Sequence, residues 1–445
     1  MKILYLDWAS KGRDADISEP VLIYLEKFFG HKVIRESIYQ FEFKLIKYRP
    51  DVLILANAVG APNNFLACKL ASLMGIKVVT MISEGDCPDS KDAAQMFFWG
   101  WNKDFKLYED LHLEWSTKNY EIIKKYIKNI NFDIIKVSGA TGFDKYKILQ
   151  FMTKNDFLTK YKKEKFNKII LIASWGFDLY FTDYLEKYKS DIIKRFGSIE
   201  IVEKIKSNRD AINSIYKELI EKNPDILFIL KFHPGTFNFD ETEFNGLQDY
   251  ENVVCIHKEE NIFDLINVSD LLIAFESTTA MEAWLLNKKS ILVTPKFGDF
   301  ERSEISNGSP IVKTYSELQS LVNEFYSTNN IEVFEKLADT RNYIIKKIIE
   351  HDDGKNHIRA AKYIQEFIDK SIKKNIDYIF VIKHILLALY REFIISFKLY
   401  KLPFFSKFKQ NLWLRNMYDK NERLAIKHLY EISLDKFYKN YGNDV

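Results

Sequence analysis

The sequence contains few cysteines and no recognisable export signal. Only three cysteines occur among 445 residues, and Cys68, Cys87 and Cys255 match no metal-binding or redox spacing. This excludes a disulfide scaffold and is typical of a reducing compartment. The N-terminal MKILYLDWAS is strand-like and acidic, without the basic start and longer apolar core of a secretory signal. We therefore expect a cytoplasmic protein.

Several catalytic signatures are also missing. The sequence has no G-x-x-x-x-G-K-[ST] loop, no G-x-G-x-x-G fingerprint, no G-x-S-x-G elbow and no H-E-x-x-H pair. Kinases, dehydrogenases, esterases and metalloproteases therefore lose their usual support. Asp14-Ala15-Asp16 is an acidic triplet in an irregular loop, and Asp352-Asp353-Gly354 indicates a turn. We expect no metal site at either place.

No apolar run reaches the roughly eighteen uninterrupted residues that a membrane span needs. The longest run lies near the C-terminus and is broken by Lys383 and His384, then by Arg391 and Glu392. Residues 371–445 contain 14 Lys and Arg against 7 Asp and Glu, a net charge of +7, while the preceding residues carry −4. This basic, aromatic tail favours an amphipathic helix on an anionic membrane surface. The alternative is a helical subdomain packed on the body or on a second subunit, and nucleic acid is disfavoured because no binding motif is present.

The remaining chain alternates short apolar runs with helical patterns. Strands are predicted at 2–8, 51–57, 77–83 and 133–139, and a second series at 168–176, 226–235, 252–258, 270–277 and 290–295; helices are predicted at 18–29, 64–74, 198–222 and 279–286. This α/β order predicts parallel sheets covered by helices. With 47% hydrophobic residues, the chain is long enough for two Rossmann-like, doubly wound domains facing a cleft. We place them at residues 1–155 and 166–345, followed by a helix at 346–370 that returns to the first domain and by the tail at 371–445.

One strand of the second domain ends in LFILKFHPGTF, Leu227 to Phe237. Ligands of α/β sheets bind beyond the carboxyl ends of the strands, so this ending places a histidine at a ligand-binding edge. Proline restricts the loop and glycine lets it turn sharply, so the imidazole is held by a stiff loop. A plain strand-ending turn is the alternative. The candidate nucleotide-binding residues here are Lys231, His233, Pro234 and Gly235.

Two further strand ends of this domain carry small and hydroxyl residues. IASWGFD places Ser174 and Gly176 at a turn that a phosphate or sugar can approach closely, and Asp178 beside them reads best as a helix cap. FESTTAMEAWLL begins a helix, where Thr279 and Glu282 have the spacing of a capping box. A helix start at a strand end also suits a phosphate. The candidate residues are Ser174, Gly176, Ser277, Thr278, Thr279 and Glu282.

The first domain offers acidic and basic residues at its own strand ends. Glu84 and, less strongly, Asp86 follow a strand in TMISEGDCPD, where a shielded glutamate can serve as a general base; a solvated loop acid is the alternative. The loop DWASKGRDAD follows the first strand and is charged and irregular. We predict that it recognises an acceptor or an acidic sugar through Lys11, Arg13 and Asp14.

These residues together resemble GT-B glycosyltransferases of bacterial surface polysaccharides, specifically capsule Kdo transferases and bacterial sialyltransferases. His233-Pro234 resembles their HP motif, and Ser277-Thr278-Thr279 with Glu282-Ala283 resembles their serine/threonine motif and following helix. SGATGFD, residues 138–144, is similar to the G-x-x-x-F-D element that closes the first domain, and FFWGWN, residues 97–102, to a tryptophan-glycine element of surface-carbohydrate enzymes. The resemblance covers about residues 1–365 and leaves the tail outside.

The resemblance implies transfer of an acidic sugar, of the Kdo or nonulosonic type, from a CMP-activated donor to a glycan hydroxyl. It gives His233, Ser277 and Thr278 contacts with the nucleotide and its phosphate, and it gives Glu84 and His233 catalytic roles. Glu-Gly-Asp at residues 84–86 departs from the sialyltransferase pattern of two acids followed by glycine. An imidazolium, hydroxyl groups and a helix dipole can stabilise a monophosphate leaving group, so no metal and no cofactor besides the donor are expected.

Two other functions stay open at this stage. A transferase using a UDP- or CDP-linked donor, including polyol phosphate, would place a histidine and hydroxyl groups at the same strand ends. A non-catalytic GT-B-like scaffold would work through the basic tail instead. The expected partners are a nucleotide-sugar donor, a glycan or lipid-linked glycan acceptor, the inner face of the cytoplasmic membrane and a second copy in a homodimer.

Overall fold

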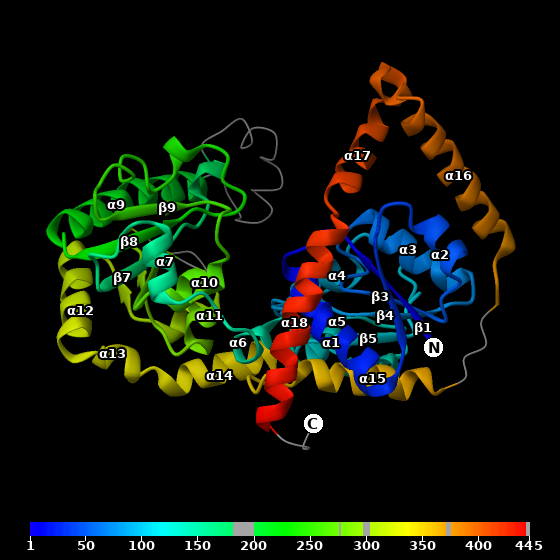
Figure 1. Ribbon diagram of the computed structural model, residues 1–445, viewed down its shortest axis with the longest axis horizontal. Coiled ribbons are helices and arrows are strands. Elements are labelled where there is room, and N and C mark those ends of the chain that lie inside the picture. The colour runs from blue at the N-terminus through cyan, green and yellow to red at the C-terminus, as the bar shows by residue number, and fades with distance from the viewer. Residues whose placement is uncertain (181–199, 276, 297–302, 371–374, 442–445) are drawn as a thin grey trace. The chain divides into compact units, whose positions relative to one another are not determined.

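The computed structural model describes residues 1–180, 200–275, 277–296, 303–370 and 375–441. The chain divides into two compact units (Figure 1). Unit 1 comprises Met1–Leu149 and Ile345–Val445, and unit 2 comprises Gln150–Ile344. The segment 346–370, which the sequence analysis expected to return to the first domain, belongs to unit 1, and so does the tail at 371–445.

Unit 1 is built on a six-stranded parallel sheet with the order β2-β1-β3-β4-β5-β6. The strands are short, and the apolar residues of the inner strands are almost completely buried because helices cover the sheet. The strands are β1 Lys2–Asp7, β2 Lys32–Ser37, β3 Val52–Leu55, β4 Lys77–Thr80, β5 Leu111–Glu114 and β6 Ile135–Val137.

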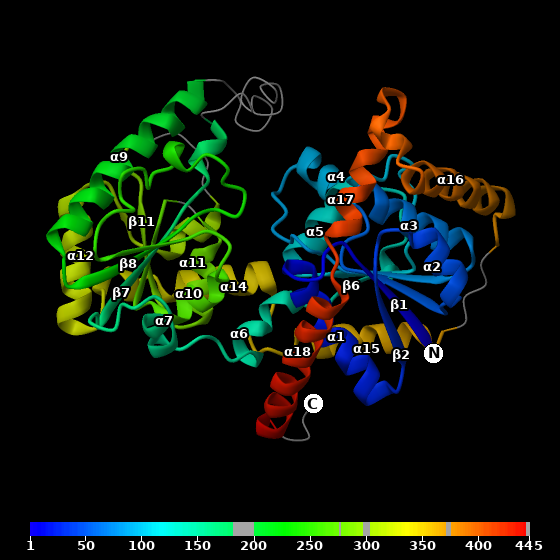
Figure 2. The same cartoon turned by 45° about the horizontal axis from the view of Figure 1, so that its top comes forward.

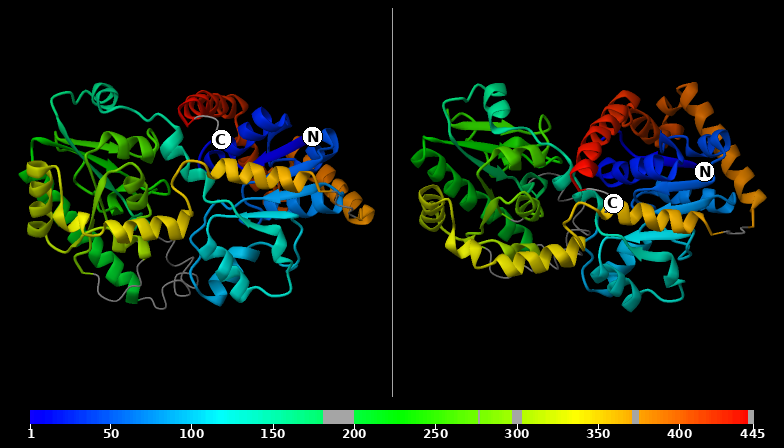
Figure 3. Two further views of the ribbon diagram at one scale, coloured as in Figure 1. Left: turned by 90° about the horizontal axis from the view of Figure 1, so that it is seen from below. Right: turned by 60° about the horizontal axis from the view of Figure 1, so that its bottom comes forward.

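The two faces of this sheet are covered by different helices. Along β1, Ile3 and Tyr5 belong to one core cluster, and Leu4 and Leu6 belong to another, as the two-residue period of a strand requires. The first cluster includes residues of α1 and α15, and the second includes residues of α2 and α3. Figure 3 shows α15 lying along the sheet of unit 1. These helices are α1 Arg13–Phe29, α2 Phe41–Tyr48, α3 Pro62–Leu73 and α15 Asn356–Ile368.

The remaining helices of unit 1 include those of the tail. α18 packs against α1, and α16 packs against α2 and α3, so the tail is part of the folded unit (Figures 1 and 2). The helices are α4 Lys91–Trp99, α5 Thr117–Tyr126, α6 Lys145–Ile148, α16 Tyr378–Ser396, α17 Lys409–Asn416 and α18 Lys420–Tyr441. No helix in the described part of the chain is both long and apolar enough to cross a membrane.

Unit 2 contains a second parallel six-stranded sheet, with the order β12-β11-β10-β7-β8-β9 (Figure 2). Its strands are β7 Lys168–Ala173, β8 Ile226–Lys231, β9 Val253–Ile256, β10 Leu271–Ala274, β11 Lys289–Val293 and β12 Ile311–Val312. Its helices among the described residues are α7 Lys154–Lys160, α9 Glu200–Lys222, α10 Ile262–Val268, α11 Thr279–Leu285, α12 Tyr315–Thr328, α13 Glu332–Glu335 and α14 Ala338–Ile349, which runs on into unit 1.

The strand order of unit 2 reverses at β7. From β7 the chain moves one way to β8 and β9, then returns to β10 on the other side and continues to β11 and β12. In open α/β sheets, ligands bind outside the carboxyl ends of the strands at such a reversal. The loops that follow β7, β8 and β10 are therefore the ones to examine for a site. The expected α/β class, with two Rossmann-like sheets and a helical C-terminal region, is confirmed.

Candidate functional site

Three loops meet at the carboxyl edge of the unit 2 sheet. The β7 loop contains Ser174 and Gly176, the β8 loop contains His233, and the β10 loop contains Ser277. β7 pairs with both β8 and β10, which places the three loops beside one another. The predicted nucleotide-binding residues of this domain therefore come from adjacent strand ends.

Asp178 joins the β7 and β8 loops. Its carboxylate is fully buried and accepts hydrogen bonds from the backbone N–H groups of Phe237 (3.0 Å) and Asn238 (3.3 Å). It also accepts a bond from the hydroxyl of Thr236 (3.4 Å). The helix that Asp178 was expected to cap lies outside the described residues, and the bonds described for this carboxylate go to a loop about 60 residues further along the chain. This carboxylate holds the segment after His-Pro-Gly in place.

The imidazole of His233 is exposed and has a defined orientation. Its Nδ1 accepts the backbone N–H of Gly235 (3.1 Å), so the proton of a neutral ring lies on Nε2. Partial loss of solvation lowers the pKa of His233. The nearby charge of Asp178 opposes this shift, and that of Lys231 adds to it. The lowered pKa favours a neutral ring near pH 7, with its proton on Nε2, whereas the sequence analysis expected an imidazolium.

Two glycines allow this arrangement. Gly176 has a φ of +82°, and a Cβ built there would lie 3.2 Å from Cγ of His233. A Cβ on Gly235 would lie 3.2 Å from Nδ1 of the same ring. The positive φ favours glycine at position 176, and any larger residue would press on the imidazole. Gly176 and Gly235 thus position His233.

A buried carboxyl group, Glu243, lies beneath the β7 loop. It accepts hydrogen bonds from the hydroxyl of Ser174 (3.1 Å) and from the backbone N–H of Trp175 (3.1 Å). Burial raises the pKa of Glu243 from 4.5 to about 7, because these hydrogen bonds only partly offset the loss of solvation. Ser174 is itself buried and also accepts the N–H of Gly176 (3.2 Å). Ser174 therefore builds the loop rather than presenting a hydroxyl group.

Lys231 ends β8, but its ammonium group is engaged within the protein. Its Nζ donates to the carbonyl oxygen of His257 and, at 3.4 Å, to that of Phe232. The residue is buried, and burial lowers the pKa of Lys231. Lys231 was a candidate for phosphate binding because it lies at the end of a strand. In the structure its ammonium group donates to backbone carbonyl groups instead.

The β10 loop presents hydroxyl groups at the start of α11. Ser277 accepts the backbone N–H of Thr279 (3.1 Å) and donates to its hydroxyl (2.8 Å). Thr278 is the N-cap residue and is exposed, and its side chain forms no capping bond. The expected capping box of Thr279 and Glu282 is wrong, because the helix begins one residue earlier than that box requires. Glu276 lies outside the described residues.

In unit 1, the structure brings together Arg13, the first residue of α1, and Glu84, which follows β4, so α1 begins within the charged segment that the sequence analysis expected to be irregular. Arg13 Nη1 lies 2.5 Å from Glu84 Oε1, and both side chains are exposed. Burial raises the pKa of the neighbouring Asp14. The positive charge of Arg13 opposes this rise in pKa, and the negative charge of Glu84 adds to it. Gly85 is required behind Glu84, because a Cβ there would lie 2.1 Å from the indole of Trp115. Arg13, Asp14 and Glu84 therefore form one candidate acceptor-binding group.

Lys11 belongs to a different set of contacts. Its Nζ lies 2.7 Å from Glu422 of α18, which also accepts the hydroxyl of Ser10. The backbone N–H of Ser10 donates to the carbonyl oxygen of Met417 (3.3 Å). The loop between β1 and α1 is thus held by the tail, a contact that no local sequence pattern indicated.

The two motifs that carried the rest of the resemblance have structural contacts. Asp144 Oδ2 accepts the backbone N–H (2.6 Å) and bonds the Nδ1 (2.8 Å) of His357, which fastens α15 to the start of α6. His357 is fully buried and Asp144 nearly so. In the tryptophan-glycine element, Trp99 is buried in a core cluster and Trp101 is exposed. The described residues contain no group of three His, Cys, Asp or Glu side chains able to hold a metal ion.

The comparisons with known proteins identify the fold. No family model and no curated protein matches the sequence. Among solved structures, the S. aureus MnaA–UDP co-structure is 14% identical, with a TM-score of 0.53, and the match covers 84% of this chain and 99% of that one. A UDP-GlcNAc 2-epimerase from Neisseria meningitidis bound to UDP-GlcNAc gives 15% identity and a TM-score of 0.52, covering 83% and 100%. The wall teichoic acid polymerase TagF, H548A, gives 11% identity and a TM-score of 0.50, covering 82% and 89%.

Such low identities establish a shared fold and nothing finer. The chain therefore has the two-domain α/β fold of the GT-B type. The narrower resemblance to Kdo transferases and sialyltransferases rests on the sequence motifs alone.

Proposed function

We propose that this protein is a GT-B glycosyltransferase of cell-surface glycan synthesis that uses a CMP-activated acidic sugar. The main support for this proposal is the charge of the candidate nucleotide-binding groups at the edge of the unit 2 sheet. His233 presents an N–H group, Thr278 presents a hydroxyl group, and the ammonium of Lys231 is bonded to carbonyl groups. Of the candidate nucleotide-binding side chains named above, His233 and Thr278 therefore offer neutral donors at this edge.

Neutral donors suit a phosphodiester better than a diphosphate. A CMP-sugar has one phosphate group, whereas UDP- and CDP-linked donors carry two and need more positive charge or a metal ion to bind. The Nε2–H of His233 and the hydroxyl of Thr278 can each donate to one phosphate oxygen. Neither contact changes with pH near neutrality if the imidazole is neutral.

The proposed reaction is a substitution at the anomeric carbon. The acceptor hydroxyl oxygen bonds to that carbon while the bond from the carbon to the phosphate oxygen breaks, and CMP leaves with the bonding electrons. A carboxylate of unit 1, Glu84 or Asp14, takes the hydroxyl proton. Arg13 orients Glu84 before the acceptor binds and provides a guanidinium for an acidic acceptor. His233 stabilises the departing phosphate by hydrogen bonding.

The test is calorimetric titration of the full chain with CMP, UMP, CDP and UDP. We expect CMP to bind most tightly and His233→Ala to weaken that binding about tenfold to a hundredfold, since a hydrogen bond to a charged group contributes about 1.5–3 kcal/mol. The matched control is His428→Ala, because His428 lies on α18 in unit 1 with its side chain 74% exposed. Its affinity should equal that of the wild type. Equal loss in both variants, or no preference for CMP, would overturn the proposal.

A UDP-linked donor is the second candidate, because two of the similar structures contain UDP or UDP-GlcNAc. Preferential UDP binding that is lost in His233→Ala would support it. Binding of none of the four nucleotides would favour the non-catalytic scaffold. In that case His233 and Thr278 would have no role in binding, and their alanine variants would behave as the wild type in every assay.

A further inference from the structure

We propose that the α16–α17 hairpin, residues 378–416, docks on an anionic lipid bilayer. This surface is independent of the nucleotide site and of the identity of the substrate. Figure 1 shows α16 and α17 as two arms that meet at a turn, which consists of the short 3₁₀ helices Leu399–Lys401 and Pro403–Phe408. Only one side of this hairpin contacts the rest of unit 1.

One face of α16 is firmly attached to unit 1. Phe380 and Val381 pack against the core cluster of α2 and α3. Arg391 pairs with Glu42 (3.0 Å), and Glu392 accepts the hydroxyl of Tyr39 (3.0 Å). These contacts fix which side of α16 faces the protein and leave the opposite side uncovered.

The opposite face of α16 is apolar and exposed. Ile379 is 83% exposed, Leu386 is 60% exposed, and Phe404 at the turn is 91% exposed. The exposed apolar residues of α16 recur at helical spacing, so they form one stripe along the helix. Monomeric proteins rarely leave such a stripe without a partner. It consists of Tyr378, Ile379, Ile382, Leu386, Leu389, Tyr390, Phe393 and Phe397, with Leu387 at its edge.

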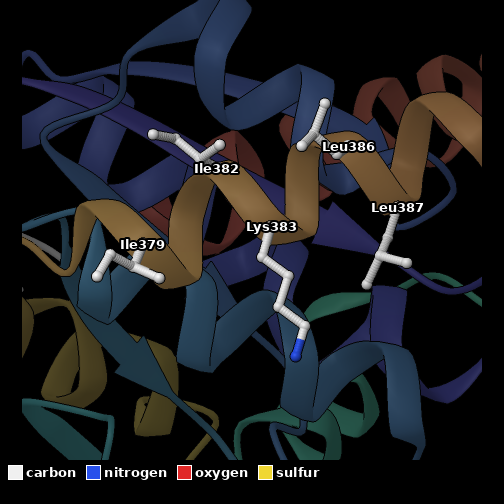
Figure 4. A pocket seen from close by; sticks show the side chains of 5 residues that line it. All are labelled: Ile379, Ile382, Lys383, Leu386 and Leu387. Atoms are coloured by element: carbon white, nitrogen blue, oxygen red, sulfur yellow. The ribbon is translucent and has the colours of Figure 1, made fainter.

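A shallow hollow on this face combines both kinds of group that a bilayer surface binds. Figure 4 shows Ile379, Ile382, Leu386 and Leu387 around it, with the ammonium of Lys383 extending away from the helix. Isoleucine and leucine can enter the acyl boundary while a lysine reaches the phosphate layer. The hollow is too open to enclose a small molecule.

The charge of the hairpin selects an anionic surface. Glu392 is the one acidic residue between residues 378 and 416, and it is engaged by Tyr39 and Gln40 of unit 1. The exposed charges are all basic, and none of them forms an ion pair with another described residue; they are Lys383, Lys398, Lys401, Lys409 and Arg415. Each basic group near an anionic leaflet adds to the attraction.

The same charges argue against a second copy as the occupant. A symmetric dimer places the same patch of both chains face to face, so the basic groups of the two copies would oppose one another. Like charges at an interface disfavour association unless acidic groups compensate them. The hairpin supplies no exposed acidic residue for this purpose.

The experiment is sedimentation of the full chain with vesicles of phosphatidylcholine, with and without about one third phosphatidylglycerol. We expect binding to the anionic vesicles, weakened by salt as surface charge attraction requires. The face variant Ile379→Ser, Leu386→Ser and Phe404→Ser should bind at least about tenfold more weakly. The matched control changes three exposed residues of α18, Leu424→Ser, Leu429→Ser and Ile432→Ser, and should bind as the wild type does.

A charge variant keeps the test valid if the face variant fails to fold. Lys383→Gln, Lys398→Gln and Lys401→Gln should remove the preference for phosphatidylglycerol without changing the apolar stripe. The proposal is overturned if the wild type ignores anionic vesicles, or if the α18 control loses as much binding as the face variant. It is also overturned if light scattering shows that the wild type is a dimer and the face variant a monomer, while the wild type does not bind vesicles.

Discussion

Replacement of Arg423 by methionine tests how the tail is joined to unit 1. Arg423 lies on α18 with its side chain only 2% exposed. Its Nε donates to Asp7 at the end of β1 (2.6 Å), and Nη1 forms an ion pair with Glu19 (2.5 Å) without hydrogen-bond geometry. Arg35 also pairs with Glu19, so the variant leaves Asp7 as the carboxylate without a cationic partner.

Removing one partner of a buried ion pair costs about 3–5 kcal/mol, because the remaining charge stays buried. Burial raises the pKa of Asp7 to about 7 even with Arg423 present. Without the arginine the pKa of Asp7 rises further. Asp7 therefore loses its proton at a higher pH in the folded variant than in the folded wild type. The stability deficit caused by Asp7 should therefore grow as the pH rises through about 7 and be smaller below it.

Amide hydrogen exchange measures this effect in each unit separately. At a pH of about 8, exchange of the β1 peptide should be roughly a hundredfold or more faster in Arg423→Met, since each 1.4 kcal/mol is a factor of ten. The β8 peptide of unit 2 serves as the internal reference and should be unchanged. The double variant Asp7→Asn with Arg423→Met should recover part of the loss. A deficit below about 1 kcal/mol, or no recovery in the double variant, would refute the reasoning.

Three other expectations concern single positions. Glu243→Gln should abolish the loss of unit 2 stability that accompanies a pH increase from about 4.5 to about 7, worth up to about 3 kcal/mol, in urea unfolding at several pH values. Gly176→Ala should weaken nucleotide binding by calorimetry about tenfold through its contact with His233, whereas Gly246→Ala, with φ +73° but no atom within 4 Å, should carry a similar backbone strain of about 1–2 kcal/mol and bind normally. Asp144→Asn should destabilise unit 1 by about 1–3 kcal/mol and speed exchange in α15, with nucleotide affinity unchanged.

Apolar strands were predictable from the sequence, and polar ones were not. The buried runs of β1, β3, β4, β7, β8, β9, β10 and β11 all fall within predicted strands, because strands covered on both faces are almost continuously apolar. β2 was missed because it is an edge strand with charged residues, among them Arg35, which bonds Glu19 and Glu26. β5, LHLE, was missed because His112 and Glu114 satisfy each other by a buried 2.9 Å bond.

The candidate site divides in the same way. His233, Ser277 and Gly176 could be found because a strand that ends in proline, glycine or hydroxyl residues leaves a local pattern. Glu243 and the carbonyl partners of Lys231 could not, because they depend on contacts between distant segments. The pairing of Arg13 with Glu84 also spans 71 positions, although both residues were candidates separately. The sequence was therefore sufficient to predict most of the candidate residues but not the contacts that they form.

The C-terminal tail has two halves whose chemistry differs, and the difference separates their roles. α18 directs Arg423 and Glu422 inward to Asp7 and Ser10, so its polar groups are used to hold the first loop of unit 1. α16 uses its polar groups, Arg391 and Glu392, to hold Glu42 and Tyr39 but leaves an apolar stripe and Lys383 exposed. Substitutions in the outer face of α16 should therefore change membrane binding without loosening unit 1. Substitutions at Arg423 should loosen unit 1 first, and any loss of membrane binding there would follow from unfolding.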